Sequence, residues 1–226
     1  MLIVVIFIFG LVIGSFLNVV ILRLKAQEPL TGRSHCPHCR HQLKWYHNIP
    51  LLSFVMLRGR CAFCQSPISW QYPLVELTTA VVFVLVAWFM PVADLSKVLL
   101  YQTISAFLVA LFVFDFKFML LPDSLTIPAV VLAFLGNWWL GVHPITLGIG
   151  MAVGGGFFAL QYYLSSKKWV GSGDIRLGLL MGAVLSWPQL IVALVLAYWA
   201  GALIGLTGMW FKHFKWGTKL PFGTFL

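Results

Sequence analysis

The sequence predicts an all-α protein that crosses the membrane several times and carries one small polar domain in a loop. Of its 226 residues, 61% are hydrophobic and only 9% are charged. Several apolar runs approach 20 residues, the length that a helix needs to span the hydrocarbon core of a bilayer. One sizeable polar stretch, residues 24–72, interrupts this pattern. These features favour a polytopic membrane protein over a soluble domain.

About seven membrane helices are expected. The first is interpreted as an uncleaved helix, because it has no basic segment before it and no small-residue cleavage pattern. The boundary between the last two rests on Pro188, since proline disfavours a helical residue before it and can begin a new helix. The chain thus divides into a first helix (1–23), a loop domain (24–72) and a membrane core (73–226). The expected spans are residues 1–22, 74–90, 97–114, 124–142, 145–165, 175–187 and 188–211.

The basic residues predict the orientation of these helices. Fourteen of the 15 Lys and Arg residues fall on one side, in or beside the 23–72 loop, the 115–123 and 166–174 turns and the C-terminal tail. Only Lys97 falls on the other side. Because cytoplasmic loops carry the excess of positive charge, these loops are expected in the cytoplasm, with the N-terminus outside.

Three of the six acidic residues lie at the cytoplasmic ends of expected spans: Asp115, Asp123 and Asp174. Charge is costly in a bilayer, so each is a functional candidate. Asp115 ends a helix, where a carboxylate opposes the dipole, and this favours a chemical role. Asp123 and Asp174 each precede an apolar helix and can equally be N-caps. Gly171 and Gly173 indicate either positive φ or close approach by another group.

Two further polar residues leave two interpretations open. Asn18 follows Gly10 and Gly14 at four-residue spacing, which favours a helix-packing face and leaves a functional role as the alternative. Glu76 lies about one turn inside the second apolar run, where it can complement a helix N-terminus or act in chemistry. Small residues at the same spacing in later helices predict packing: Gly150/Gly154, Gly178/Gly182 and Gly201/Gly205.

All four cysteines lie in the polar loop, as two Cys-x-x-Cys pairs with 21 residues between them: Cys36, Cys39, Cys61 and Cys64. Two such pairs can close a tetrahedral site of four sulfurs, which suits a structural Zn²⁺. Disulfides are the alternative, but a cytoplasmic loop is reducing and favours zinc. Four thiolates leave no open position, so the zinc is expected to be non-catalytic and the neighbouring histidines to be bystanders: His35, His38 and His41.

Five motifs follow one another along the chain: Gly14-Ser-Phe-Leu-Asn-Val19, the paired Cys-x-x-Cys loop, Tyr72-Pro-Leu-Val-Glu76, Phe114-Asp115 with Pro122-Asp123, and Gly171-x-Gly-Asp174. In this order they resemble the bacterial type IV prepilin peptidases, the GxGD class of intramembrane aspartic proteases. The resemblance implies that Asp115 and Asp174 are catalytic. It places other motif residues in supporting positions: Asp123, Gly171, Gly173, Glu76 and Asn18.

The resemblance also implies an activity. A membrane aspartic endopeptidase would remove the short basic leader from prepilins or pseudopilins at the cytoplasmic face of the bacterial inner membrane. It would also methylate the new N-terminus with S-adenosylmethionine. The expected partners are this substrate and the lipid bilayer, with no nucleic acid. The family carries one more helix after a stretch like Pro221–Leu226, so the chain is either unusually short or lacks its last span.

Two other classes compete with this interpretation. A proton- or cation-coupled transporter also uses acidic residues in the membrane. Its acids would be distributed through the bilayer, whereas here they gather at one face, and the cysteine loop would have no explanation. A membrane-anchored zinc adaptor would explain the cysteines, but one helix would suffice to anchor it.

Overall fold

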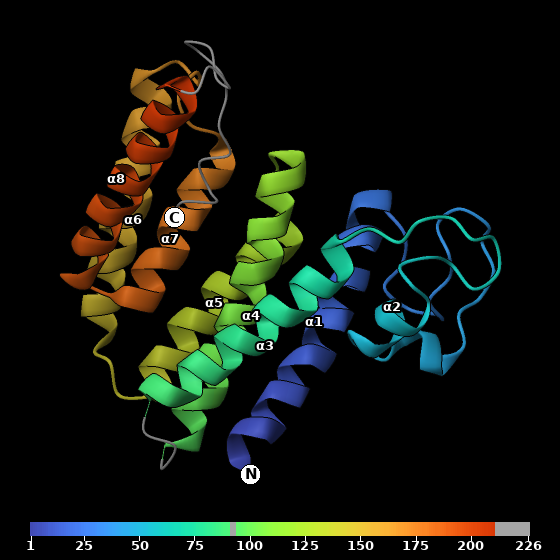
Figure 1. Cartoon of the computed structure of the whole chain (residues 1–226). Coiled ribbons are helices and arrows are strands. Elements are labelled where there is room, and N and C mark those ends of the chain that lie inside the picture. Colours follow the sequence, from blue (N-terminus) through green and yellow to red (C-terminus); the bar gives the residue numbers. More distant parts are fainter. Residues whose placement is uncertain (91–93, 211–226) are drawn as a thin grey trace. The chain divides into compact units, whose positions relative to one another are not determined.

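The computed structural model describes residues 1–90 and 94–210. These residues form eight α-helices and one 3-10 helix, η1, with no strand beyond two isolated β-bridges (Figure 1). The predicted all-α class is therefore confirmed. The elements are α1 (Leu2–Ala26), η1 (Trp45–Asn48), α2 (Leu52–Met56), α3 (Gln71–Phe89), α4 (Leu95–Phe118), α5 (Asp123–Trp139), α6 (Pro144–Leu164), α7 (Ser172–Leu185) and α8 (Gln189–Trp210). The last basic residues and the Pro221–Leu226 stretch lie outside the described residues.

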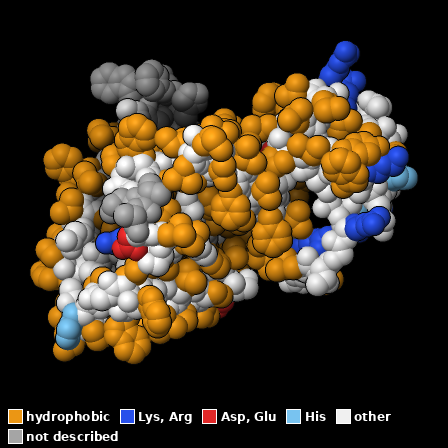
Figure 2. Space-filling view, turned by 90° about the horizontal axis from the view of Figure 1, so that it is seen from below, with side chains coloured by type: hydrophobic (Ala, Val, Ile, Leu, Met, Phe, Trp, Pro, Cys, Tyr) orange, Lys and Arg blue, Asp and Glu red, His pale blue; other side chains and the backbone are white. Residues whose placement is uncertain are grey.

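The seven expected membrane helices correspond to α1 and α3–α8. Within the described residues, five of them are long and apolar enough to cross a bilayer: α1, α3, α4, α6 and α8. Helices α5 and α7 have 17 and 14 residues, so they reach only about 25 Å and 21 Å at 1.5 Å per residue. Hydrophobic side chains nevertheless cover much of the visible surface, as expected where helices face lipid (Figure 2).

The expected helix ends were wrong by a few residues at two places that matter for the site. Helix α4 continues to Phe118, because the backbone turns left-handed only at Met119, with φ 50°. Helix α7 begins at Ser172, because Gly171 is the extended residue that precedes it. Asp115 and Asp174 therefore lie inside helices, in the last turn of α4 and the first turn of α7.

The chain forms two compact units, of which the first is Met1–Ala110 and the second begins at Leu111. In the first unit α1 packs along α3. A Cβ added at Gly10 would lie 2.5 Å from Cα of Ala80, and one at Gly14 would lie 2.6 Å from Cα of Glu76. Only glycine permits this approach, so the packing face expected on α1 is confirmed.

In the second unit α6 packs against α7 through two pairs of glycines. A Cβ added at Gly154 would lie 2.3 Å from the carbonyl oxygen of Gly178, and one at Gly182 would lie 2.3 Å from that of Gly150. The packing expected of these two pairs is confirmed, whereas that of Gly201/Gly205 stays a prediction. An apolar core lies beside this contact, formed by Phe158, Val170, Met181, Leu190 and Leu194.

Candidate active site and metal centre

Asp174 is the third residue of α7 and is buried, with 8% of its surface exposed. Its Oδ2 accepts a hydrogen bond of 2.7 Å from the backbone N–H of Gly171. The cap position is thus occupied by Gly171, and the N-cap interpretation of Asp174 is wrong by three residues. The side chain reaches back over the helix start in the manner of a capping box, which holds the carboxylate near the positive end of the helix.

The two motif glycines differ in what they permit. Neither is among the described glycines with positive φ, so that part of the expectation was wrong. Close approach is confirmed at Gly173, where an added Cβ would lie 2.8 Å from Cβ of Leu121. The turn after α4 therefore packs directly against the start of α7. At Gly171 the nearest atom to an added Cβ is Oδ2 of Asp174, at 3.6 Å, within the motif itself.

Asp123 is the first residue of α5, and Pro122 occupies the cap position that was expected for it. The Asp123 side chain is largely exposed, and its Oδ1 forms an ion pair with Nη1 of Arg176. Because Arg176 lies two residues after Asp174, this pair joins the start of α5 to the first turn of α7. Sequence reasoning did not single out Arg176, although a basic residue inside an apolar run was a usable signal.

Asp115 lies in the last turn of α4 and is buried, with 6% of its surface exposed. Its backbone carbonyl accepts the N–H of Met119 at 2.9 Å, the bond that closes the helix. Leu121, two residues further on, reaches Gly173. One short stretch of chain thus runs from the buried carboxylate of Asp115 to the backbone that positions Asp174.

Asn18 is almost completely buried in the first unit and connects α1 to the start of α3. Its Nδ2 donates to the carbonyl oxygens of Gly14 at 3.3 Å and Tyr72 at 3.1 Å, and its Oδ1 accepts from Nε2 of Gln71 at 3.2 Å. The bonds to Tyr72 and Gln71 run across the helix contact, as the packing interpretation predicts, whereas the bond to Gly14 stays within α1.

Glu76 is also buried, and its Oε2 accepts the backbone N–H of Leu51 at 2.8 Å. Glu76 is the sixth residue of α3, beyond the first turn, so its carboxylate serves the loop and not the amides at the start of its own helix. Leu51 has φ 58°, a left-handed conformation that is unfavourable for leucine. Ser15 of α1 hydrogen-bonds to the same carboxylate. Glu76 therefore joins two helices to a strained point of the loop.

The four cysteine sulfurs lie within 4.8 Å of one another, and Sγ of Cys36 is 3.9 Å from Sγ of Cys64. A tetrahedral Zn²⁺ with Zn–S bonds of about 2.3 Å needs sulfurs about 3.8 Å apart. The distances therefore fit zinc, and all four cysteines are free. The hydroxyl of Ser66 lies 3.0 Å from Sγ of Cys64, and the side-chain and backbone hydrogen bonds of Ser66 lower the pKa of that thiol to about 6, whereas the pKa of the Cys39 thiol is raised to about 11.

The two cysteine pairs have the same backbone turn. The carbonyl of Cys36 accepts the N–H of Arg40 at 2.9 Å, and that of Cys61 accepts the N–H of Gln65 at 3.0 Å. Arg40 and Gln65 both have φ 58°. Each turn directs its two thiols to the same side, which is how Cys-x-x-Cys pairs form a metal centre.

Two of the neighbouring histidines contact other groups. Nε2 of His35 lies 3.9 Å from the carboxylate of Glu28, and the ring of His41 lies on that of Phe63 with centroids 3.6 Å apart. Within the described residues, the group suited to a metal consists of the cysteines alone. This agrees with the prediction that the histidines are not ligands.

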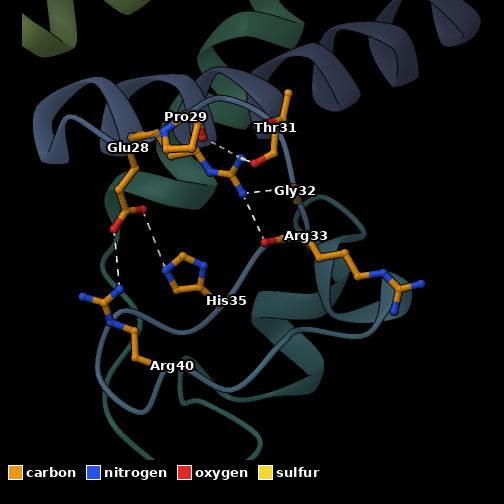
Figure 3. A network of polar contacts seen from close by, with 8 residues as sticks. Glu28, Pro29, Thr31, Gly32, Arg33, His35 and Arg40 are labelled. Carbon is orange, nitrogen blue, oxygen red and sulfur yellow. Dashed lines mark hydrogen bonds and ion pairs between the residues drawn. The ribbon is translucent and has the colours of Figure 1, made fainter.

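Arg23 fixes the entry into the cysteine loop, and sequence reasoning missed it. Its guanidinium is buried at the end of α1 and donates to four backbone carbonyl groups. In the same segment Glu28 pairs with His35 and with Arg40 (Figure 3). The charge of Arg23 is thus satisfied by carbonyl dipoles, which hold the chain in a tight arc. The acceptors are Pro29 at 3.2 Å, Thr31 at 2.7 Å, and Gly32 and Arg33 at 3.1 Å each.

The metal centre gives a direct prediction. Purified protein is expected to hold close to one zinc per chain, and replacing Cys36 and Cys39 by Ser should release it, because two of the four ligands are lost. Structural zinc contributes on the order of 10 kcal/mol to folding, so the loop should also become protease-sensitive while the helices stay inserted.

Elemental mass spectrometry measures the metal. His38→Ala is the matched control and should keep it. Stoichiometric iron, or no metal under reducing conditions, would contradict the site.

Comparison with known proteins gives two family matches along this chain. Residues 8–90 match the bacterial peptidase A24 N-terminal domain, and residues 102–206 match the type IV leader peptidase family. A prepilin leader peptidase/N-methyltransferase of Aeromonas hydrophila is 37% identical over 251 aligned positions, covering 98% of this chain and 86% of the relative. The chain belongs to the type IV leader peptidase family.

Other members of the type IV leader peptidase family are similarly related. The prepilin leader peptidase/N-methyltransferase of Burkholderia pseudomallei (strain 1026b) is 34% identical, with 96% of this chain and 80% of the relative covered. That of Myxococcus xanthus (strain DK1622) is 38% identical, with 88% and 61% covered. No solved structure matches the chain. The Asp115–Asp123 stretch and Asp174 lie within the second family match, whereas Asn18, Glu76 and the cysteines lie within the first.

Proposed function

We propose that this protein is a membrane aspartic endopeptidase that removes the leader from type IV prepilins or pseudopilins, and that it methylates the new N-terminus. The observation that carries the proposal is that the carboxylates of Asp115 and Asp174 are both buried in the second unit. The turn that follows Asp115 packs directly against the Gly-x-Gly-Asp backbone. The relatives that carry the name prepilin leader peptidase/N-methyltransferase support both activities.

In this proposal Asp115 and Asp174 act together on one water molecule. Two neighbouring carboxyl groups cannot easily both ionise, so the pair shares one proton. The ionised member takes a proton from water as the water attacks the scissile carbonyl, and the protonated member hydrogen-bonds to the carbonyl oxygen. The pair titrates as a unit. No metal is required, and the zinc centre has a structural role.

Asp123 and Arg176 have a supporting role. Their ion pair holds the beginnings of α5 and α7 together, and so restrains the helix turn that carries Asp174. Gly173 supports the same turn, because its missing side chain leaves room for Leu121. Misplacement of a catalytic group by about 1 Å can cost 10²-fold in rate, so such restraints matter to catalysis.

The proposed setting is the bacterial inner membrane, with the cysteine loop and both catalytic aspartates at the cytoplasmic face and the N-terminus outside. The distribution of Lys and Arg supports this orientation. A prepilin would present its short basic leader to this face while its apolar helix stays in the bilayer. The cut would then fall at the depth of the helix ends that carry Asp115 and Asp174.

The methylation belongs to the first unit in this proposal, with Glu76 orienting or deprotonating the new amine. A buried carboxylate suits both a protonated amine and a cationic methyl donor. S-Adenosylmethionine, when bound, supplies an electrophilic methyl group. Asn18 and the zinc loop would keep α1, α3 and Leu51 in place around Glu76.

The assay that tests the proposal uses the purified protein in detergent with a prepilin substrate. We expect mass spectrometry to show a product that has lost its leader and, with S-adenosylmethionine present, one that has also gained a methyl group. An intact substrate after prolonged incubation with zinc-loaded protein would overturn the peptidase proposal. A cleaved but unmethylated product would overturn the second activity alone.

Glu76→Gln separates the two activities. Glutamine keeps an oxygen that can accept the N–H of Leu51, so the loop should stay in place, but it removes the negative charge and the base. We therefore expect methylation of cleaved pilin to fall about 10²-fold or more while cleavage continues. Product masses measure both. Equal loss of cleavage and methylation would mark Glu76 as structural.

A further inference from the structure

A groove of about 710 Å³ lies in the first unit where the cysteine loop meets the beginning of α3. Its walls come from the turn before α2, from α2 itself, from the residues on either side of the second cysteine turn and from α3. The residues used below are Leu51, Phe54, Val55, Arg58, Leu74 and Leu77. The groove lies in the unit that holds the metal centre, but it is used neither by the zinc site nor by the proposed catalytic pair of aspartates.

The groove is apolar and continuous with the membrane surface of α3. Leu74 and Leu77 line it and are 58% and 42% exposed, and both belong to a helix long and apolar enough to cross a bilayer. On the loop side, Val55 is 73% exposed. Exposed aliphatic side chains of α3 and of α2 therefore line the same groove, which a purely aqueous loop would not favour.

An interfacial aromatic residue marks the border of this surface. Trp70 precedes α3, is 69% exposed and lines the groove. Its ring lies 5.0 Å from that of Phe54, measured between centroids. Tryptophan is enriched at the level of lipid headgroups, because its ring is apolar and its N–H is polar. The groove thus opens at headgroup depth.

The charge around the groove is positive. Between residues 27 and 70 the chain has five Lys and Arg residues but only one acidic residue, Glu28, which pairs with Arg40. Lys and Arg side chains gather over this part of the molecule beside hydrophobic ones, on the right of Figure 2. Arg58 lines the groove, is exposed, and forms no ion pair with any described residue.

We propose that this groove binds an anionic phospholipid, with an acyl chain between α2 and the start of α3 and the headgroup phosphate at Arg58. A phospholipid suits both the apolar wall and the positive charge of the groove. Its tail is apolar, and its phosphate supplies the negative partner that Arg58 does not have among the described residues. A basic prepilin leader would meet a like charge there. Bound lipid would attach the zinc loop to the membrane surface, independently of the proposed peptidase activity.

The experiment measures lipid bound to the intact, zinc-loaded protein by native mass spectrometry in a nonionic detergent. Phosphatidylglycerol is the probe, and phosphatidylcholine is the zwitterionic comparison. We expect one tightly held phosphatidylglycerol per chain and weaker retention of phosphatidylcholine. Arg58→Gln should weaken phosphatidylglycerol binding about fivefold, the effect of one basic residue at an anionic surface. Equal retention of the two lipids, or no retention of either, would overturn the proposal.

Matched variants separate this site from diffuse attraction. Arg33 is exposed in the same loop and does not line the groove, so Arg33→Gln should leave phosphatidylglycerol binding almost unchanged. Val55→Glu places a charge in the apolar wall and should abolish binding, whereas Gln42→Glu adds the same charge at an exposed position elsewhere in the loop and should not. Equal effects within either pair would overturn the site.

A last arm tests the prepilin as the alternative occupant. In lipid-free detergent, Arg58→Gln and Val55→Glu are expected to cleave prepilin with unchanged KM and to keep their zinc. A raised KM for prepilin in both variants would assign the groove to the substrate and overturn the lipid proposal.

Discussion

Asp115→Asn and Asp174→Asn are each expected to abolish leader cleavage while expression, membrane insertion and zinc content stay near normal. Asparagine preserves the shape of both side chains, and at position 174 it can still accept the N–H of Gly171. It can neither take a proton from water nor share one with the other carboxyl group. Loss of general acid–base catalysis by one positioned group costs roughly 10²–10⁴-fold, and more when the water is no longer activated. The mobility shift of a prepilin measures the rate.

Asp123→Asn is the control for this pair. Its carboxylate is exposed and paired with Arg176, so its loss should weaken only a restraint on α7, and pairs of this exposure contribute about 1 kcal/mol or less. We expect a milder fall in rate. An inactive Asp123→Asn beside a fully active Asp115→Asn would mean that the wrong aspartate of this stretch has been chosen. Full activity of both the Asp115 and the Asp174 variants would overturn the aspartic mechanism.

Gly154→Ala is expected to destabilise the second unit and to reduce cleavage, although the change adds one methyl group. The added Cβ would lie 2.3 Å from the carbonyl oxygen of Gly178, a backbone atom that cannot rotate away. Helices α6 and α7 must then separate, and overpacking of this kind typically costs about 1–3 kcal/mol. Because α7 carries Asp174, the displacement should also misplace the catalytic carboxylate.

Gly156→Ala is the matched control, two residues further along the same helix. An added Cβ there meets nothing within 4 Å. Alanine is a better helix former than glycine by up to about 1 kcal/mol, so this variant should be as stable as the parent or more stable. Thermal unfolding in detergent and the cleavage rate measure both variants. Equal behaviour of the two would mean that the close contact between α6 and α7 is absent.

Much of the fold could be predicted from the sequence, because the bilayer makes hydropathy decisive. Within the described residues, apolar length alone gives five of the membrane helices, since every backbone group in the bilayer must be paired within its own segment, whereas α5 and α7 are shorter than a full span. The four-residue spacing of the glycine pairs that include Gly154 and Gly178 predicted packing surfaces, and the structure confirms that these two glycines meet. The two Cys-x-x-Cys pairs were similarly readable, because a short-range turn fixes the direction of both thiols.

The tertiary structure decided what the polar residues contact. From the sequence, Glu76 could either complement the dipole of a helix N-terminus or take part in chemistry. In the structure its carboxylate accepts the backbone N–H of Leu51, 25 residues earlier in the chain. Asp123 and Asp174 were both candidate N-caps, yet the side chain of Asp123 pairs with Arg176 and that of Asp174 accepts a bond from Gly171. Hydrophobic periodicity is a local property that specifies which face of a helix is buried. The partner of a buried charge depends on which distant segment folds against it, and that is set only when the helices pack.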